Sequence, residues 1–244
     1  MPTPKKVAET DAIFAQLGLL HATIDPRVLR ISLDAKATVA VGPFSRRGTS
    51  RVAVRAADHD FHPTATVTPV GIFLPQTDAL FLYGVLSKVT SDCLVDCLEH
   101  WWQEHGAQYP TVRTLLLNLD NGPECHSRRT QFIFRLAQFA RHTGLTVQLA
   151  YYPPYHSKYN PVERCWGVLE QHWNGSLLDS VDTVLQFAAT MTWKGRSPRV
   201  TRMTALYATG IKLLKAEMAI LEAQIHRLPQ LGKWFVTIPA TTTA

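Results

Sequence analysis

The sequence lacks any feature that would carry it into a membrane or out of the cell. No apolar run approaches the roughly 20 residues that a bilayer crossing needs. The N-terminus, with Lys5 and Lys6 followed by Glu9 and Asp11, has no apolar signal-peptide core. We therefore expect a cytoplasmic protein with no membrane partner.

The sequence also lacks the cysteine spacings of a disulfide framework or of a common zinc site. Its four cysteines are Cys93, Cys97, Cys125 and Cys165, and no two of them form a CxxC pair. Cys93, Cys97 and His100 would share a helix face as zinc ligands, but no fourth ligand is evident. Free thiols at buried or neutral positions are the stronger interpretation.

Composition and charge place the chain among globular proteins with a polyanionic partner. Its 244 residues, 46% of them hydrophobic, suffice for one substantial core and an appendage. The net charge of +6 is uneven, because residues 1–120 hold 11 Lys and Arg against 12 Asp and Glu, whereas residues 121–244 hold 14 against 7. The basic second half suggests nucleic acid.

Hydrophobic periodicity predicts an alternating α/β domain after an N-terminal helix at residues 1–20. Residues 35–65 are polar and read as a long loop, with a short extended piece near residues 51–55. Residues 114–119 are almost wholly apolar, which is typical of a central strand buried on both faces. The expected strands are 28–34, 66–74, 79–86, 114–119 and 146–151, and the expected helices are 91–105, 130–142 and 161–173.

The region after residue 175 is predicted to be a helical extension interrupted by a basic loop. A helix is expected at residues 181–191, and a long helix at residues 203–227 because Ile211, Leu214, Met218, Leu221 and Ile225 recur at helical spacing. Between them, Gly195 and Pro198 favour a loop. Its cations are Lys194, Arg196, Arg199 and Arg202, which either contact nucleic-acid phosphates or form a solvated surface.

Three carboxylates stand at the ends of expected elements. Asp34 ends the first strand, Asp120 follows the central strand, and Glu163 opens a later helix. Each also has an ordinary explanation. Asp34 and Asp120 suit turns, and Asp120 precedes Asn121-Gly122. Glu163 suits a capping box behind Asn160 and Pro161.

Together, the three acids have the chemistry of a divalent-cation site. Mg²⁺ prefers a few oxygen ligands and keeps positions open for phosphate and water. Two such ions about 4 Å apart activate the attacking oxygen and stabilise the leaving oxygen in phosphodiester cleavage. The order of the acids, on the first strand, on the central strand and at a later helix, matches a ribonuclease H-like mixed sheet flanked by helices.

Longer motifs around these acids carry a specific resemblance. They are Arg30-Ile31-Ser32-Leu33-Asp34-Ala35-Lys36, Asn118-Leu119-Asp120-Asn121-Gly122-Pro123-Glu124, and Tyr152-Pro153-Pro154-Tyr155-His156-Ser157-Lys158-Tyr159-Asn160-Pro161-Val162-Glu163-Arg164. With these motifs the sequence resembles the Rhodopirellula-type DDE transposase domain of bacterial insertion sequences, a group related more distantly to mariner-like transposases and retroviral integrases.

The resemblance implies a catalytic domain at residues 28–175, an N-terminal helix and linker at 1–27, and a C-terminal extension at 176–244. It implies that Asp34, Asp120 and Glu163 bind two Mg²⁺ or Mn²⁺ ions and catalyse cleavage at transposon ends and strand transfer into target DNA. The implied partners are these DNAs and further copies of the chain in the DNA complex, acting on a bacterial chromosome. No convincing helix-turn-helix precedes Asp34, so two interpretations stay open: a transposase truncated at its N-terminus or a remnant reading frame.

Further polar residues are candidates for DNA contacts. Those nearest the acids are Lys36, His156, Lys158 and Arg164, and surface charge or ordinary packing would explain each equally well. Tyr152 and Tyr155 have the rings to stack on unpaired bases. Asp60, in the cluster Asp58-His59-Asp60 with His62, is a reserve acid should Asp34 have no role. Trp166 and Trp173, seven residues apart on one helix, are interpreted as core residues without chemistry.

Two other functions fit the same residues. One is a non-catalytic remnant that binds DNA or a full-length transposase through its basic surface. The other is a ribonuclease H-like nuclease that cuts without joining. The three acids argue against complete decay, and only a joining assay separates a transposase from a nuclease.

Overall fold

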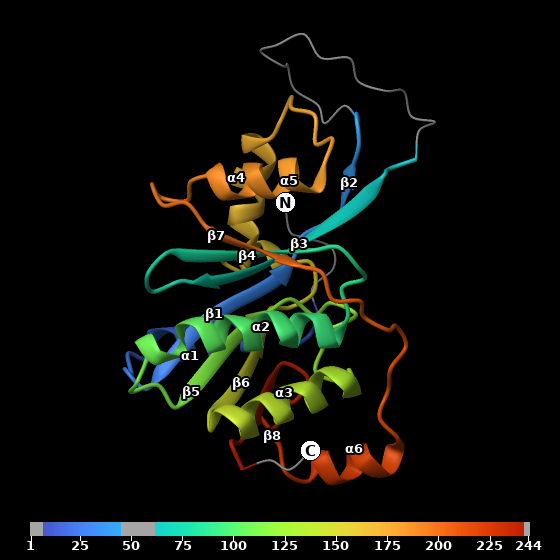
Figure 1. Ribbon diagram of the computed structural model, residues 1–244. Helices are drawn as coiled ribbons and strands as arrows, with labels where there is room; N and C mark the ends of the chain where they lie inside the picture. The colour runs from blue at the N-terminus through green and yellow to red at the C-terminus, as the bar shows by residue number, and fades with distance from the viewer. Residues whose placement is uncertain (1–6, 45–61, 242–244) are drawn as a thin grey trace. The chain divides into compact units, whose positions relative to one another are not determined.

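The computed structural model of the protein describes residues 7–44 and 62–241 (Figure 1). The chain divides into two compact units. Unit 1 takes its residues from 1–33, 90–160 and 208–244, and unit 2 from 34–89 and 161–207. Strand β1 (Val28–Ala35) therefore begins in unit 1 and ends in unit 2, with the boundary just before Asp34.

Unit 1 is built on a mixed sheet. Strand β1 pairs in parallel with β5, and β5 in parallel with β6. Strand β9 then pairs antiparallel with both β6 and β8. The other elements of this unit are α1 (Thr10–Ala22), α2 (Ser91–His105), the 3-10 turns η1 (Gly106–Gln108) and η2 (Ser157–Tyr159), β5 (Thr114–Leu119), α3 (Thr130–Thr143), β6 (Thr146–Tyr151), α6 (Lys215–Glu222), β8 (His226–Arg227) and β9 (Phe235–Ile238).

Strand β5 lies between two parallel neighbours, and its last five residues are buried. This confirms the expectation of a central strand from the apolar run at 114–119. The register with β1 runs from the pair Val28 and Thr114 to the pair Ser32 and Asn118. Because neighbouring parallel strands end at the same sheet edge, Ser32 and Asn118 mark the end of this ladder towards the candidate acids.

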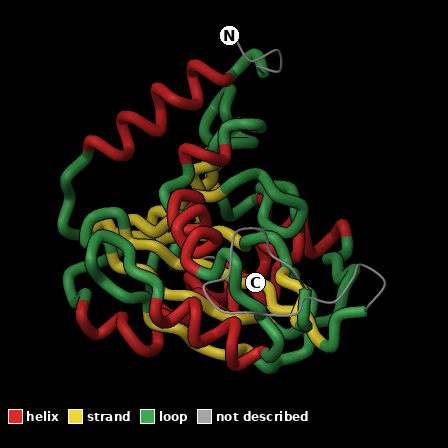
Figure 2. The backbone as a smooth tube through the Cα atoms, turned by 90° about the horizontal axis from the view of Figure 1, so that it is seen from above, coloured by secondary structure: helices red, strands yellow, loops and turns green. Residues whose placement is uncertain are grey.

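Helices flank the strands (Figure 2). In unit 1, α2 and α3 lie side by side (Figure 1), joined by an ion-pair network in which Arg135 contacts Asp92, Asp96 and Glu99. Thr90 caps α2 by accepting a hydrogen bond of 3.3 Å from the Cys93 amide. No helix within residues 7–44 and 62–241 is long and apolar enough to cross a membrane.

Unit 2 has its own mixed strands, in which β4 pairs antiparallel with β3 and parallel with β7, and β2 pairs antiparallel with β3. Helices α4 and α5 lie above β3, β4 and β7 in Figure 1. The elements are β2 (Val39–Val41), β3 (Ala65–Leu74), β4 (Ala79–Val85), α4 (Glu163–His172), α5 (Val181–Thr190) and β7 (Arg199–Met203).

The core of unit 2 forms around Trp166 of α4 and Trp173, which directly follows this helix. Trp166 is 6% exposed and Trp173 is 0% exposed, and they belong to one apolar cluster with Phe73 on β3 and Leu82 on β4. The interpretation of both rings as core residues is therefore confirmed. Gly71 on β3 makes the close approach of α4 possible, because a Cβ there would lie 2.6 Å from the Trp166 ring and 2.8 Å from Val162.

The helix expected at residues 203–227 was wrong. Residues 199–203 form strand β7 beside β4, helix α6 covers only Lys215–Glu222, and residues 226–227 form β8. Only the later part of the expected helical stripe is buried: Leu221 and Ile225 belong to the core, whereas Leu214 is 71% exposed and Ile211 41%. The described part of this extension, residues 176–241, therefore contains three strands as well as two helices.

Other expectations are met closely. The strands and helices predicted between residues 66 and 191 appear within about two residues of their expected ends. All four cysteines are buried and free. Residues 35–65 are not entirely loop, since they contain β2 and the first residue of β3. The extended piece near residues 51–55 and Asp58, His59 and Asp60 lie outside the described residues.

Candidate active site

Asp34 lies near the end of β1, half-buried, where the strand fixes its backbone. Its Oδ2 accepts a hydrogen bond of 2.7 Å from the indole Nε1 of Trp166 on α4. A carboxylate that accepts a short N–H bond is held more firmly than a solvated one, because the charged acceptor strengthens the bond. Trp166, given no chemistry from the sequence, thus contacts the first candidate acid.

Asn160 secures the strand end immediately before Asp34. Its side chain is fully buried, accepts a 2.5 Å hydrogen bond from the Ser32 hydroxyl and donates one of 3.4 Å to the Leu33 carbonyl. The expectation that Asn160 caps the next helix was wrong. Helix α4 begins at Glu163 with Val162 at the capping position and no side-chain cap. The buried amide is better satisfied by β1 than by a solvent-facing helix end.

Glu163 is the first residue of α4 and is half-buried. The N-terminus of a helix favours a carboxylate because its free N–H groups carry partial positive charge. Residues three apart on a helix share a face, so Glu163 lies on the same face of α4 as Trp166, which holds Asp34. Both acids belong to unit 2, and both lie where α4 meets the end of β1.

Asp120 follows β5 in unit 1. Its Oδ1 accepts hydrogen bonds from the Gly122 amide at 3.2 Å and from the Cys125 thiol at 3.4 Å. This is the local turn bonding that the Asp120-Asn121-Gly122 sequence predicts. A Cβ at residue 122 would lie 3.1 Å from that oxygen, so glycine leaves room for the carboxylate. Asp34 and Asp120 each stand two residues beyond the last β1–β5 pair, Ser32 and Asn118.

The three acids offer the right donor chemistry for a divalent cation. Carboxylate oxygens are hard ligands that suit Mg²⁺ or Mn²⁺, and all three acids are half-buried rather than sequestered. Asp34 and Glu163 lie in unit 2, and Asp120 lies in unit 1. Within either stretch that the structure describes, no three His, Cys, Asp or Glu side chains form a ready-made metal cluster.

The residues near the acids that were expected to contact DNA differ in how strongly they interact with other parts of the protein. Lys36 is largely buried and forms an ion pair with Glu170 of α4. Arg164 and Lys158 are exposed, and the Lys158 ammonium lies 5.4 Å from the Tyr159 ring. His156 packs against Phe14 of α1, and its Nδ1 donates a 2.8 Å hydrogen bond to the Pro154 carbonyl.

The aromatic residues in this segment differ in exposure. Tyr152 is 4% exposed, and its hydroxyl accepts a hydrogen bond from Arg30, so it does not present its ring as a stacking surface. Tyr155, held at a positive φ of 64°, is 65% exposed. Tyr159, which the sequence interpretation passed over, is 47% exposed.

The basic segment of unit 2 is a tight turn followed by a strand. Lys194 and Gly195 adopt positive φ at the turn, whereas Arg199 and Arg202 lie on β7 rather than in a loop. Lys194 pairs with Asp78 at 3.0 Å, Arg202 pairs with Asp182 at 3.0 Å, and Arg196 donates to the Thr77 carbonyl. Exposed pairs of this kind are weak, so these cations remain able to exchange partners.

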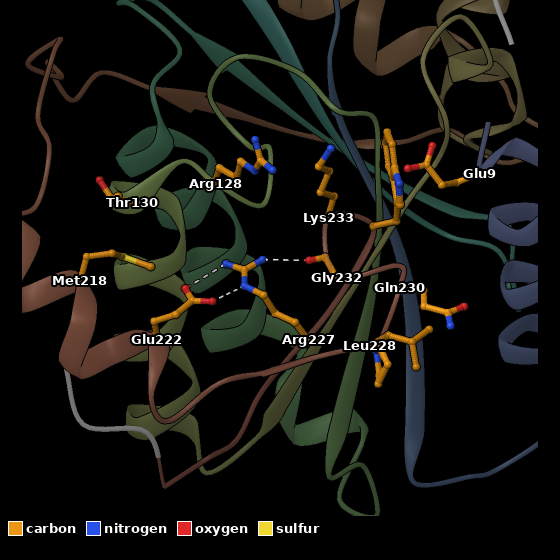
Figure 3. Close-up of a pocket in the computed structure, with 12 residues that line it drawn as sticks. Glu9, Arg128, Thr130, Met218, Glu222, Arg227, Leu228, Gln230, Gly232 and Lys233 are labelled. Atoms are coloured by element: carbon orange, nitrogen blue, oxygen red, sulfur yellow. Dashed lines mark hydrogen bonds and ion pairs between the residues drawn. The ribbon is translucent and has the colours of Figure 1, made fainter. Parts of the chain in front are cut away.

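Unit 1 contains an open pocket of about 650 Å³ beside the segment that follows Asp120 (Figure 3). Arg227 lies across it, bonded to Glu222 and to the Gly232 carbonyl. Arg128 and Lys233 line the same pocket, are exposed, and make no side-chain ion pair or hydrogen bond within the described ranges. Two hydrogen bonds join the pocket wall to the segment that follows Asp120. Ser127 donates to the Lys233 carbonyl at 2.7 Å, and Arg227 donates to the Ser127 carbonyl. Sequence reasoning missed both cations, since they are far apart along the chain.

Solved structures with a fold similar to this one include complexes of Mos1 transposase. The Mos1 paired-end complex with the left transposon end has a TM-score of 0.51 at 12% identity, over 77% of this chain and 56% of that one. The Mos1 mariner paired-end complex with Mn has a TM-score of 0.50 at the same identity and coverage. This chain thus spans just over half the length of these neighbours. No curated protein sequence matches it.

The mixed strands, the flanking helices and this likeness define an α/β domain of the ribonuclease H-like class, as expected from the order of the acids. The family described as Rhodopirellula transposase DDE domain matches residues 2–240. The chain belongs to that family, so the resemblance found in its motifs is confirmed.

Proposed function

We propose that this chain is the catalytic domain of a DNA transposase that cuts phosphodiester bonds at transposon ends and joins them to target DNA. The observation that carries the proposal is the placement of the acids. Asp34 lies near the end of β1, Asp120 follows the adjacent parallel strand β5, and Glu163 begins the helix whose Trp166 holds Asp34. The chain's membership of a family of transposase DDE domains supports the interpretation of these acids as catalytic.

The cofactor in this proposal is Mg²⁺ or Mn²⁺, with two ions held by Asp34, Asp120 and Glu163. When bound, such ions polarise phosphate and generate the attacking hydroxide or 3′ alkoxide. The protein's part is to present carboxylates from rigid elements: Asp34 restrained by Trp166, Asp120 by the Gly122 turn, and Glu163 by α4. Preorganised ligands reduce the cost of assembling the site.

DNA backbone contacts in this proposal come from cations with few protein partners. Arg164 follows Glu163 directly, Lys158 precedes it, and both are exposed. Arg128 and Lys233 line the pocket of unit 1 and supply two further positive charges (Figure 3). Phosphate contacts of this kind position DNA without reading its sequence. Assembly of further copies of the chain in the DNA complex is part of the same proposal.

A joining assay tests this function. Labelled DNA bearing the element's ends is incubated with protein and Mg²⁺ or Mn²⁺, and cleaved and joined products are resolved. Wild type is expected to cut and join, whereas Asp34→Asn, Asp120→Asn and Glu163→Gln each lose both activities, because an amide cannot replace a carboxylate ligand. Glu124→Gln, at a nearby acid ion-paired with Arg129, is the matched control.

Three outcomes distinguish the alternatives. Cleavage without joining would indicate a ribonuclease H-like nuclease. DNA binding with neither reaction would indicate a non-catalytic remnant. Activity that survives in the three acidic-site variants would overturn the assignment of the site.

A further inference from the structure

The buried indole of Trp166 is hydrogen-bonded to one of the candidate metal ligands. It is 6% exposed, yet its Nε1 donates at 2.7 Å to a carboxylate 132 positions away in the sequence. The indole N–H is a donor only, and burial makes an unpaired donor costly, so the ring requires an acceptor at this position. The acceptor is Asp34, the first of the candidate metal ligands.

The position of the Trp166 ring is fixed independently of this hydrogen bond. Gly71 on β3 leaves space that the ring fills, since a Cβ there would lie 2.6 Å from Cη2 and 2.9 Å from Cζ2 of Trp166. The ring also belongs to the apolar cluster of unit 2, which contains Leu169 and Val162 from the same helical segment. A ring held on its other edges directs Nε1 towards one point, where Oδ2 of Asp34 lies.

Trp173, which follows the last residue of α4, has the same kind of bond with a carboxylate that is not a candidate metal ligand. Trp173 Nε1 donates at 2.9 Å to Oε2 of Glu170, and Glu170 is ion-paired with Lys36. Trp173 is fully buried, as Trp166 nearly is. The two residues therefore differ mainly in which carboxylate the indole holds, which makes Trp173 a matched control.

We propose that Trp166 is a positioning residue for metal binding: its N–H restrains Oδ2 and so fixes the orientation in which Asp34 meets a divalent cation. This rests on the proposed function, in which Asp34 is a ligand. Groups that hydrogen-bond to ligands orient them, and removing such a group typically lowers metal affinity by roughly 10- to 100-fold. Because Glu163 lies on the same helix face as Trp166, the ring also links the positions of two ligands.

The test measures Mn²⁺ affinity without DNA or turnover. Free Mn²⁺ is followed by electron paramagnetic resonance during titration of the full chain and its Asp34→Asn, Trp166→Phe and Trp173→Phe variants. Phenylalanine keeps most of the ring packing and removes the N–H. We expect Asp34→Asn to abolish the tightest binding, Trp166→Phe to weaken it by roughly 10-fold, and Trp173→Phe to leave it unchanged within about twofold.

A second measurement needs no tryptophan substitution. In protein labelled with ¹⁵N-tryptophan, the Trp166 indole N–H resonance is expected to shift on adding Mg²⁺, while the Trp173 resonance stays in place. In Asp34→Asn the Trp166 shift should disappear. This measurement keeps the proposal testable if Trp166→Phe does not fold.

The outcomes separate the two proposals. If wild type does not bind Mn²⁺, or Asp34→Asn binds it as well as wild type, the metal site itself is wrong. If wild type binds through Asp34 but Trp166→Phe binds equally well and the Trp166 resonance does not respond to Mg²⁺, only the positioning role is overturned. Equal weakening in Trp166→Phe and Trp173→Phe would also overturn it, by showing a general effect on packing.

Discussion

The Ser32 hydroxyl donates a 2.5 Å hydrogen bond to Oδ1 of Asn160, and both side chains are fully buried. The same amide donates to the Leu33 carbonyl, so one asparagine joins the strand that carries Asp34 to the segment that leads into Glu163. Burial makes this bond costly to break, because a partner left without its hydrogen bond keeps its full desolvation penalty.

Replacing Asn160 is expected to affect both stability and the candidate site. Asn160→Ala removes the two buried hydrogen bonds with the Ser32 hydroxyl and the Leu33 carbonyl, and the free energy of unfolding should fall by roughly 1–3 kcal/mol. Urea denaturation measures that loss. Asn174→Ala, which replaces an exposed asparagine, serves as the control. A double-mutant cycle with Ser32→Ala should give a coupling energy different from zero, and strict additivity would contradict the bond's contribution.

Removing the two unpaired cations of the unit 1 pocket should weaken DNA binding. Each phosphate contact adds about 0.9 to the salt dependence of the binding constant. The Arg128→Ala, Lys233→Ala double variant is therefore expected to reduce the slope of log K against log salt by up to about 2, across unrelated DNA sequences. Fluorescence anisotropy at several salt concentrations measures it. Lys88→Ala with Lys212→Ala removes equal charge from other exposed positions. If the two double variants weaken binding equally, the pocket makes no specific contribution.

The parts of the fold that were predictable are those determined by local pattern. The apolar run at 114–119, the turn at residues 75–78 and the helical periodicity of 130–142 all express their own residues' preferences. The α/β class followed from that alternation. The family motif around Glu163 then supplied the acids, whose separate local explanations, a turn and a helix cap, gave no reason to group them.

The parts that were not predictable depend on distant partners. Residues 199–203 became a strand because β4 offered them a parallel ladder, and 235–238 because β6 offered an antiparallel one. The helical spacing of Ile211 and Leu214 did not lead to a helix at these residues, and both side chains are exposed. Asn160 had a plausible capping position, but its side chain instead forms hydrogen bonds with Ser32 and Leu33 of β1. The role of Trp166 was equally hidden, since its partner lies 132 residues away.

The packing of α2 against α3 should depend on Arg135. Its guanidinium contacts Asp92 at 3.0 Å, Asp96 at 2.8 Å and Glu99 at 3.3 Å, and the side chain is only 18% exposed. Arg135→Ala leaves three carboxylates of one helix facing each other, so we expect unfolding free energy to fall by roughly 1–3 kcal/mol. Arg135→Lys should recover only part, because an ammonium cannot reproduce the planar fork.

Thermal denaturation in low and high salt measures both variants. The loss caused by Arg135→Ala should shrink as salt rises, because screening reduces the repulsion among the three acids. Arg141→Ala, at an exposed position of the same helix, is the control. A loss for Arg135→Ala no greater than for Arg141→Ala would contradict the role of the network.

His21 should make unit 1 less stable as the solution becomes acidic. Burial and, to a smaller extent, the nearby charge of Arg30 together lower the pKa of His21 from 6.5 to about 4, although a hydrogen bond with Asn118 partly opposes the shift. The folded state therefore favours the neutral imidazole, and the unfolded state binds the extra proton between these two pKa values. The contribution of His21 is fully present above about pH 6.5 and is lost as the pH falls towards 4.

Comparing wild type with His21→Gln isolates this effect, because glutamine does not titrate. The difference in unfolding free energy between the two proteins, measured by urea denaturation from pH 7 to pH 4, should change in favour of the variant as the pH falls. The exposed His142→Gln variant should follow the wild-type dependence. A wild-type to His21→Gln difference that stays constant with pH would mean that the imidazole of His21 is protonated equally in the folded and unfolded chains.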